Sequence, residues 1–321
     1  GIDRVTRIAV TGASGFVGSH TARALLANGN DVVLVARHPN LIANPPGART
    51  TWVTADINDE AALTRAVTGC ESVIHCAGIN LERGSQTYGR VHVRGTETVV
   101  RAARSAGVPR IALVSFLRAR PACGSPYHES KWAAEEIVRG SGLSYTIVKA
   151  GVIYGKGDHM VDHLSRALNS FPVFLLVGFG SRRTLRPVAV ADLARILAAS
   201  VDDDRLARVT VPALGPEELT LALAVRRVAR EIGRHPRYIP APIAVHRALA
   251  WMLERAMTTP LVSAAQVRIL AEGIVDPVLA ADRLPLDLMP MTRFTPQSIR
   301  DGLPPNRRFT RADLRAFDRA G

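Results

Sequence analysis

A tyrosine and a lysine four residues apart, Tyr127 and Lys131, are the side chains best suited by type to move a proton. They fall at the start of a predicted helix over residues 126–139, where positions i and i+4 share one face. A nearby ammonium favours the phenolate, so we expect Lys131 to lower the pKa of Tyr127 from about 10 toward working pH. Such a tyrosine is a candidate general acid/base. The spacing is also common by chance, and the alternative is an exposed helical pair.

Three glycines at intervals of three, Gly12, Gly15 and Gly18, lie between a short apolar strand and a helix predicted over residues 19–27. Gly12 would allow the turn its unusual backbone angles, Gly15 would let the main chain approach a diphosphate, and Gly18 would let the helix lie close on the strand. Unpaired N–H groups at the helix N-terminus favour phosphate. The pattern predicts a dinucleotide site formed by Gly12, Ser14, Gly15, Phe16, Val17 and Gly18; an ordinary turn is the alternative.

The ends of the following strands indicate the cofactor type. The strand predicted over residues 31–36 ends at Arg37, which could pair with a 2′-phosphate, whereas an acidic residue there is typical of NAD sites. We therefore expect NADP, with NAD as second choice, although Arg37 could be a solvated loop residue. Asp56, followed by Ile57, ends the strand over 51–55 and could accept from adenine or cap the helix over 60–67. Ala77 and Gly78 end the strand over 72–77 and would let a nicotinamide ribose lie close.

Strands alternate with helices every twenty to thirty residues, with further elements over residues 89–106 and 110–115. This alternation predicts an α/β fold with a Rossmann-type doubly wound parallel sheet, whose ligands bind at the carboxyl ends of the strands. Every loop named above lies at that edge. The Tyr127–Lys131 pair follows the fifth strand directly, so it would reach the same edge.

The composition limits the class of protein. The chain has 321 residues, 47% of them hydrophobic, which is enough for a large core. The net charge of +13 could suggest nucleic acid, but the arginines are scattered and aromatic residues make up only 5%, so we expect no nucleic-acid partner. Three cysteines without metal-type spacing favour reduced thiols in a cytoplasmic setting and no metal. The polar residues 1–7 do not look like a signal segment, and no apolar run predicts a transmembrane span.

The chain resembles the extended or atypical branch of the short-chain dehydrogenase/reductase superfamily, the branch of the NAD-dependent epimerases and dehydratases. The resemblance covers about residues 7–240. It is also similar to the nucleotide-binding accessory subunit of respiratory NADH dehydrogenase. The motifs that carry it are residues 11–18 (TGASGFVG), Asp56, residues 91–96 (VHVRGT), 127–131 (YHESK), 150–158 (AGVIYGKGD) and 187–194 (PVAVADLA).

The resemblance implies that Tyr127 is the acid/base and that Lys131 activates it and holds the nicotinamide ribose. Three departures from the family pattern affect the site. The two hydroxyl residues usual after the fifth strand are Ser115 and Phe116 here, so Ser115 would be the polariser of the substrate oxygen by a small shift. The helical asparagine of the family corresponds to His92, which could relay a proton, and the usual Arg-Pro is Lys149-Ala150.

The resemblance also implies a smaller C-terminal α/β substrate lobe. We expect residues 1–158 to form the dinucleotide-binding core, with 187–213 returning to it, and residues 159–186 and 214–321 to form the lobe and a helical tail. Three arginines there, Arg182, Arg183 and Arg186, could grip an anionic substrate group or could line a basic surface loop. The apolar tail over residues 243–273 could be core, or a face that meets a membrane, a lipidic substrate or another subunit.

These expectations lead to an NADP-dependent oxidoreductase or epimerase/dehydratase-like enzyme. It would move a hydride between nicotinamide and a hydroxyl or carbonyl of a small-molecule substrate such as a nucleotide sugar or a lipidic carbonyl. The alternative is a non-catalytic NAD(P)-binding redox sensor or assembly subunit. We expect a cytoplasmic location and leave membrane association and a homodimer open.

Overall fold

The computed structural model describes residues 5–38, 49–177, 184–257, 267–268, 271–272, 276–303 and 308–309. The chain divides into two compact units. The first comprises Gly1–Ala150, Val190–Ala213 and Asp276–Pro290, and the second Gly151–Ala189, Leu214–Val275 and Met291–Gly321. The first stretch of the first unit therefore ends at Ala150, whereas the sequence predicted that the core extends to residue 158.

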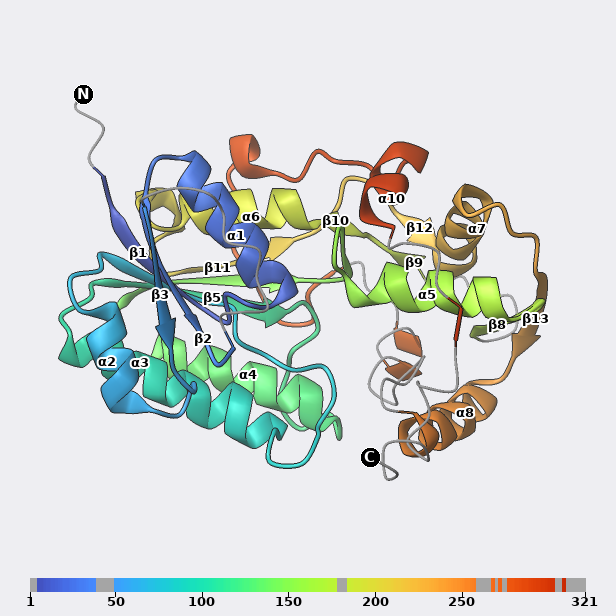
Figure 1. The fold of residues 1–321 in the computed structure, drawn as a ribbon, viewed down its shortest axis with the longest axis horizontal. Helices are drawn as coiled ribbons and strands as arrows, with labels where there is room; N and C mark the ends of the chain where they lie inside the picture. The colour runs from blue at the N-terminus through green and yellow to red at the C-terminus, as the bar shows by residue number, and fades with distance from the viewer. Residues whose placement is uncertain are drawn as a thin grey trace. The chain divides into compact units, whose positions relative to one another are not determined.

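The first unit contains a seven-stranded sheet in which every strand pairing is parallel, in the order β11-β6-β5-β4-β1-β2-β3 (Figure 1). The predicted doubly wound sheet is confirmed. The strand order reverses between β1 and β4, which is the place where such sheets open a crevice for a ligand. The strands are β1 Arg7–Thr11, β2 Asp31–Ala36, β3 Thr50–Thr54, β4 Ser72–His75, β5 Arg110–Phe116, β6 Ser144–Ala150 and β11 Val209–Ala213.

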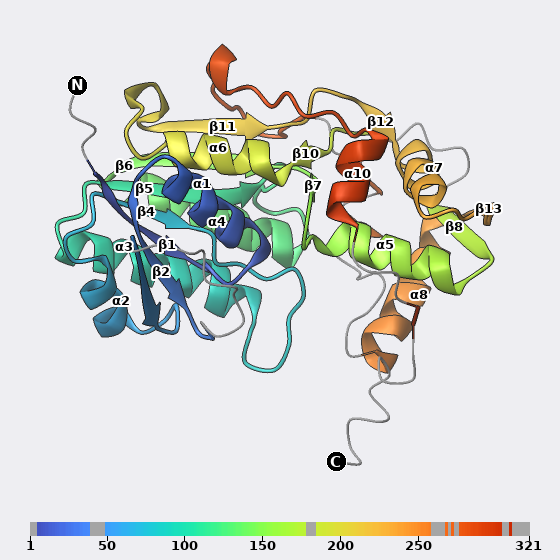
Figure 2. The same ribbon diagram turned by 45° about the horizontal axis from the view of Figure 1, so that its top comes forward.

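Helices cover both faces of this sheet, α1 and α6 on one and α2, α3 and α4 on the other (Figure 2). The layer of α2, α3 and α4 packs on the sheet and buries a continuous apolar core with it, which includes Val33, Leu63, Val99 and Ile147. The helical elements of the first unit are α1 Phe16–Ala27, α2 Glu60–Val67, π-helix η2 Gly89–Arg94, α3 Gly95–Ser105, α4 Pro126–Arg139, α6 Val190–Ala199, and the 3₁₀ turns η3 Asp204–Leu206 and η4 Leu286–Leu288.

The helix predicted over residues 89–106 is two elements. Its first six residues, Gly89–Arg94, form the π-helix η2, and α3 follows directly at Gly95. A π-turn widens the helix by one residue and often marks a functional site. The prediction of one regular helix was wrong because the residue types of this stretch suit either geometry.

In the described residues, the second unit is a smaller α/β assembly of short paired strands and helices. Its core includes Tyr154, Leu168, Val228 and Phe294. The elements are β7 Ile153–Tyr154, α5 His159–Ser170, β8 Val173–Val177, β9 Thr184–Leu185, β10 Val188–Ala189, β12 Leu219–Thr220, α7 Leu221–Glu231, β13 Arg237–Ala241, α8 Ile243–Ala256 and α10 Pro296–Gly302.

The segment 276–290 belongs to the first unit, although the sequence placed it with the lobe. Arg195 on α6 holds this segment by donating to the backbone oxygens of Asp287, Leu288 and Met289. Arg205 adds a two-pronged ion pair with the Asp287 carboxylate. Proline-rich sequence alone did not reveal these side-chain anchors.

Candidate active site

The glycine turn connects β1 to α1 at the edge where the strand order reverses. Gly12 has φ of +67°, a conformation that glycine adopts at no steric cost. A Cβ on Gly12 would lie 2.6 Å from the backbone nitrogen of Ala77, and a Cβ on Gly18 would collide with the Gly12 carbonyl oxygen. The turn therefore packs directly on the loop after β4 and under the first turn of α1.

The surface of this turn suits a diphosphate. Ser14 and Gly15 are exposed, Phe16 and Val17 are half-buried, and α1 carries no acidic residue in its first turn. Gly15 is the N-cap and carries no Cβ, so a ligand can approach the N–H groups at the helix start closely. The chemistry of this donor set fits the phosphates of a dinucleotide.

The loop after β4 meets Lys131 of α4. A Cβ on Gly78 would lie 3.2 Å from Lys131 Nζ, and the same Nζ donates to the backbone oxygen of Val114 at 3.2 Å. Desolvation lowers the pKa of Lys131 to about 8, although Cys76 and Glu135 oppose the shift. The structure thus brings together Gly12, Ala77, Gly78 and Lys131.

Tyr127 lies one turn before Lys131, at the buried end of α4, within a cluster of rings. The ring centroids of Tyr88, Phe116 and His92 lie 5.6, 5.5 and 5.8 Å from that of Tyr127. Burial, with the neighbouring Tyr88, raises the pKa of Tyr127. The expectation that Lys131 lowers this pKa was wrong, because desolvation of the phenolate dominates.

His92 links the loop after β4 to helix α4. Its Nε2 accepts from the Ile79 N–H at 3.1 Å, and its Nδ1 lies 2.8 Å from Ser130 Oγ. Ser130 Oγ donates to the Tyr127 backbone oxygen. Since Nε2 accepts, the neutral ring must carry its proton on Nδ1 and donate it to Ser130. Burial and the charge of Lys131 lower the pKa of His92 to about 2, which keeps the ring neutral.

This shift predicts an acid sensitivity that His92→Asn relieves. Below pH about 6.5 the unfolded chain protonates His92 and the folded chain does not, so stability falls with pH by up to about 1.4 kcal/mol per unit. Asparagine can make both hydrogen bonds without titrating. Urea unfolding at several acidic pH values should show a shallower pH slope for His92→Asn, while the exposed His235→Asn keeps the slope of the wild type. Equal slopes for His92→Asn and the wild type would contradict the assignment.

Ser115, the expected polariser, is engaged elsewhere. Its hydroxyl donates to Glu135 Oε1, and this buried carboxylate also pairs with Lys149 Nζ at 2.9 Å and Arg139 at 2.9 Å. Ser115, Glu135 and Lys149 are almost fully buried. Successive residues of a strand point to opposite faces, so Phe116, rather than Ser115, contacts the Tyr127 ring.

Asp56 lies at the other end of the site, with two arginines near it. Although burial opposes ionisation, hydrogen bonds from Asn58 and the charges of Arg90 and Arg37 lower the pKa of Asp56. Arg90 of η2 lies 3.6 Å from the Asp56 carboxylate. The N-cap of α2 is Asp59 rather than Asp56, so the capping alternative for Asp56 is excluded. Ile57 packs on Gly95 at the start of α3.

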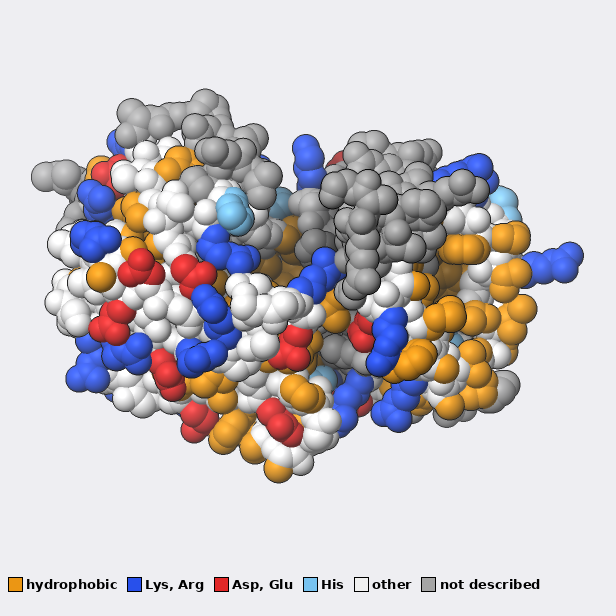
Figure 3. All heavy atoms as spheres, turned by 60° about the horizontal axis from the view of Figure 1, so that its bottom comes forward, with side chains coloured by type: hydrophobic (Ala, Val, Ile, Leu, Met, Phe, Trp, Pro, Cys, Tyr) orange, Lys and Arg blue, Asp and Glu red, His pale blue; other side chains and the backbone are white. Residues whose placement is uncertain are grey.

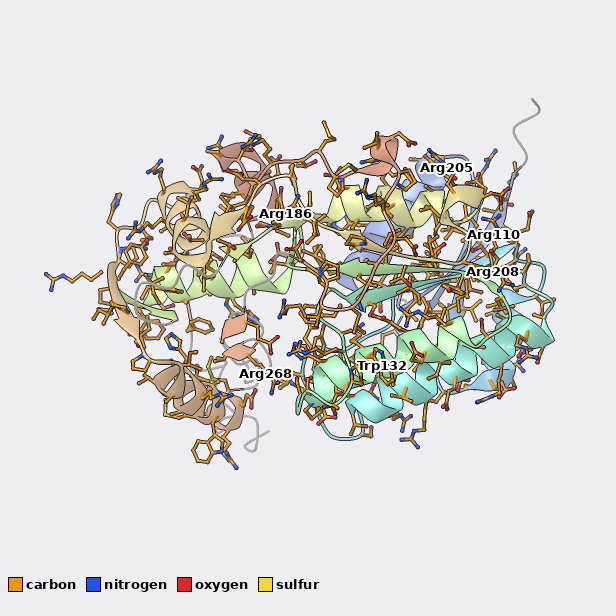
Figure 4. The ribbon with its side chains drawn as sticks, turned by 180° about the vertical axis from the view of Figure 1, so that it is seen from behind. Arg110, Trp132, Arg186, Arg205, Arg208 and Arg268 are labelled. Atoms are coloured by element: carbon orange, nitrogen blue, oxygen red, sulfur yellow. The ribbon has the colours of Figure 1, made fainter. Side chains whose placement is uncertain are left out.

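Of the three arginines predicted to bind substrate, Arg182, Arg183 and Arg186, the structure describes Arg186. Arg182 and Arg183 lie outside the described residues. Arg186 belongs to the second unit and is labelled in Figure 4. It exchanges hydrogen bonds with Gly215, its Nε donating to the Gly215 oxygen at 2.9 Å. This contact joins two segments of the second unit and gives Arg186 a structural role there.

Sequence reasoning missed Tyr88, Arg90 and Glu135. Tyr88 stacks on His92 with ring centroids 5.4 Å apart and donates to the Asn80 oxygen, so it supports the same loop. Gly89 begins η2 and Gly95 begins α3, but neither glycine distinguishes a π-helix from a regular helix in the sequence. Among the described residues no group of three or more His, Cys, Asp or Glu side chains could hold a metal, and no helix is long and apolar enough to cross a membrane.

Known proteins share this sequence pattern. A family model described as NAD(P)H-binding matches residues 12–204. A ceramide reductase of Caulobacter vibrioides is 34% identical over 238 residues, 73% of each chain. The 40 kDa subunit of the NADH-ubiquinone oxidoreductase of Neurospora crassa is 24% identical over 273 residues, 84% of this chain and 72% of the subunit. Three longer mycobacterial relatives are 30% identical over 263 residues, and the match spans 27% of their length.

Solved structures share the fold. The UDP-glucose 4-epimerase of Thermus thermophilus, in complex with NAD, superposes with a TM-score of 0.62 at 22% identity. The superposition covers 74% of this chain and 86% of the epimerase. At this identity the likeness concerns the fold alone.

Proposed function

Since the chain belongs to the NAD(P)H-binding family, within the extended branch of the short-chain dehydrogenases/reductases, we propose that it is an NADP-dependent oxidoreductase. It would transfer a hydride between nicotinamide and a hydroxyl or carbonyl group of its substrate. The observation that carries the proposal is the meeting of Gly12, the Ala77-Gly78 loop and Lys131 beside Tyr127 at the carboxyl edge of the sheet.

The dinucleotide would be held along this edge. The turn of Gly12, Ser14, Gly15, Phe16, Val17 and Gly18 would bind the diphosphate, Asp56 and Ile57 would border the adenine, and Ala77, Gly78 and Lys131 would border the nicotinamide ribose. When bound, the cofactor supplies or accepts the hydride. Tyr127 would give the proton to the substrate oxygen in reduction and take it in oxidation, so hydride and proton together balance the carbonyl-to-alcohol change.

Arg37 favours NADP over NAD because it is an exposed cation at the end of β2, where a 2′-phosphate would lie. Arg37→Ser should weaken NADPH binding by roughly ten- to a hundredfold, the range of a hydrogen bond to a charged group, and leave NADH binding unchanged. Fluorescence titration of the reduced nicotinamide measures both affinities. Arg65→Ser, an exposed arginine on α2, is the matched control for net charge. An unchanged NADPH affinity in Arg37→Ser would remove the 2′-phosphate role.

For the substrate we propose a lipidic ketone. Two observations support this class over a nucleotide sugar: the 34% identity to a ceramide reductase, and the apolar ring cluster of Tyr88, Phe116 and Tyr127 at the acid/base. The test is NADPH oxidation, followed by absorbance, with long-chain ketones and with nucleotide-sugar substrates. Turnover with the ketones supports the proposal, and turnover confined to nucleotide sugars would overturn it.

A specific observation favours a second candidate, a non-catalytic redox sensor or assembly subunit. The hydroxyl expected to polarise the substrate is held by Glu135, and Phe116 occupies the neighbouring position. The relative in Neurospora crassa is a subunit of a mitochondrial NADH-ubiquinone oxidoreductase. Cofactor binding without turnover on any carbonyl substrate would support this candidate.

A further inference from the structure

Helix α8 of the second unit exposes an apolar face. Exposed residues at helical spacing form one stripe along α8, apolar except for the arginine at its end. We call it the α8 stripe, and it consists of Ala244, Val245, Ala248, Trp251, Met252 and Arg255. The exposed fractions of Trp251 and Met252 are 59% and 51%, large values for side chains of this size and hydrophobicity. Apolar side chains beside one another on a surface mark an interaction site.

The opposite side of α8 fixes the helix to its own unit. His246 and Ala250 are buried there, and the His246 ring nitrogens lie 3.2 and 3.4 Å from the backbone oxygens of Pro242 and Leu175. The stripe is therefore the outward face of an anchored helix. Apolar side chains lie beside Lys or Arg side chains on one face of the molecule (Figure 3).

The exposed charges on α8 and on the strand before it have one sign. Between residues 237 and 257 the exposed charged side chains are Arg237, Arg247 and Arg255, and the acid of α8, Glu254, is half-buried. The Arg255 guanidinium lies 3.8 Å from the centroid of the Trp251 ring. An arginine with an apolar stem over tryptophan suits the boundary between lipid tails and headgroups, where tryptophan is enriched and basic side chains reach the phosphates.

We propose that the α8 stripe binds the surface of an anionic lipid membrane, with α8 lying in the plane of the headgroups. Trp251, Met252 and Val245 would enter the acyl boundary, and Arg247 and Arg255 would pair with the lipid phosphates. Because the exposed charges beside the stripe are positive, an anionic lipid surface is favoured over the other partners that an apolar face could bind. The proposal is independent of the catalytic assignment, because the stripe shares no residue with it.

Sedimentation of the full chain with vesicles tests the proposal. The protein should pellet with vesicles that contain phosphatidylglycerol, release at high salt, and stay in solution with pure phosphatidylcholine. Trp251→Ser with Met252→Ser, and separately Arg247→Glu, should each weaken the association roughly tenfold or more. Leu286→Ser with Met289→Ser removes comparable exposed apolar surface from another segment and should bind as the wild type.

Two results would overturn it. One is a wild-type protein that stays in solution with anionic vesicles, or variants of the stripe that pellet as the wild type does. The other is a concentration-dependent dimer, seen by analytical ultracentrifugation, that Trp251→Ser with Met252→Ser abolishes while vesicles bind nothing. That result would assign the stripe to a second copy of the chain.

Discussion

Tyr127→Phe should lower turnover by roughly a hundred- to ten-thousandfold, the contribution of a positioned acid/base, and leave NADPH affinity unchanged. The ring would keep its contacts with Phe116, Tyr88 and His92, so only the transferable proton is lost. Steady-state kinetics with a substrate from the carbonyl screen, beside a binding titration, measures the two quantities separately.

Tyr145→Phe is the matched control, because Tyr145 packs against the sheet core and lies outside the site. It should keep full turnover. Full turnover in Tyr127→Phe would remove the acid/base role from Tyr127, and loss of cofactor binding in that variant would show that the hydroxyl serves the cofactor rather than the proton transfer.

Glu135→Ala should lower the free energy of unfolding by about 3–5 kcal/mol, the cost of leaving a buried charge without its partner. The carboxylate neutralises Lys149, which is 1% exposed, and also accepts from Ser115 and Arg139. Urea unfolding measures the change. The matched control is the next residue, Glu136, which is half-exposed and, within the described part of the chain, pairs with Arg139, so Glu136→Ala should cost less than about 1 kcal/mol.

A second variant keeps this prediction testable if Glu135→Ala does not fold. Glu135→Leu combined with Lys149→Met replaces both buried charges with apolar side chains of similar size and should recover most of the lost stability. Equal stability of Glu135→Ala and the wild type would show that the buried pair contributes nothing. A double variant as unstable as Glu135→Ala would show that the loss does not come from the unpaired lysine.

Much of the fold could be predicted because local patterns agree with it. The strand over residues 31–36, the helix over 60–67 and the helix over 126–139 have the predicted bounds. Short apolar runs bounded by glycine or other turn residues are typical of buried parallel strands. The loops at the carboxyl edge follow from that topology, which is why the sequence predicts one site for Gly12, Ala77, Gly78 and Lys131.

The rest depends on contacts between distant residues. The acid that holds Ser115 is twenty positions away on another element, and nothing in the sequence around Glu135 distinguishes it from the solvated Glu136. The pKa of Tyr127 is raised because burial desolvates the phenolate, with a further electrostatic contribution from Tyr88, and helical spacing to Lys131 carries no information on burial. The π-turn of η2, which places Tyr88 and His92 against Tyr127, has no residue signature that separates it from a regular helix.

Titration of the purified protein with NADPH and with NADH, followed by nicotinamide fluorescence, tests the central claim most directly. We predict saturable binding of both, with the tighter affinity for NADPH. Tighter binding of NADH would contradict the role of Arg37 and the choice of NADP. Binding of neither cofactor would contradict the proposal that the glycine turn, the Ala77-Gly78 loop and Lys131 form a working dinucleotide site.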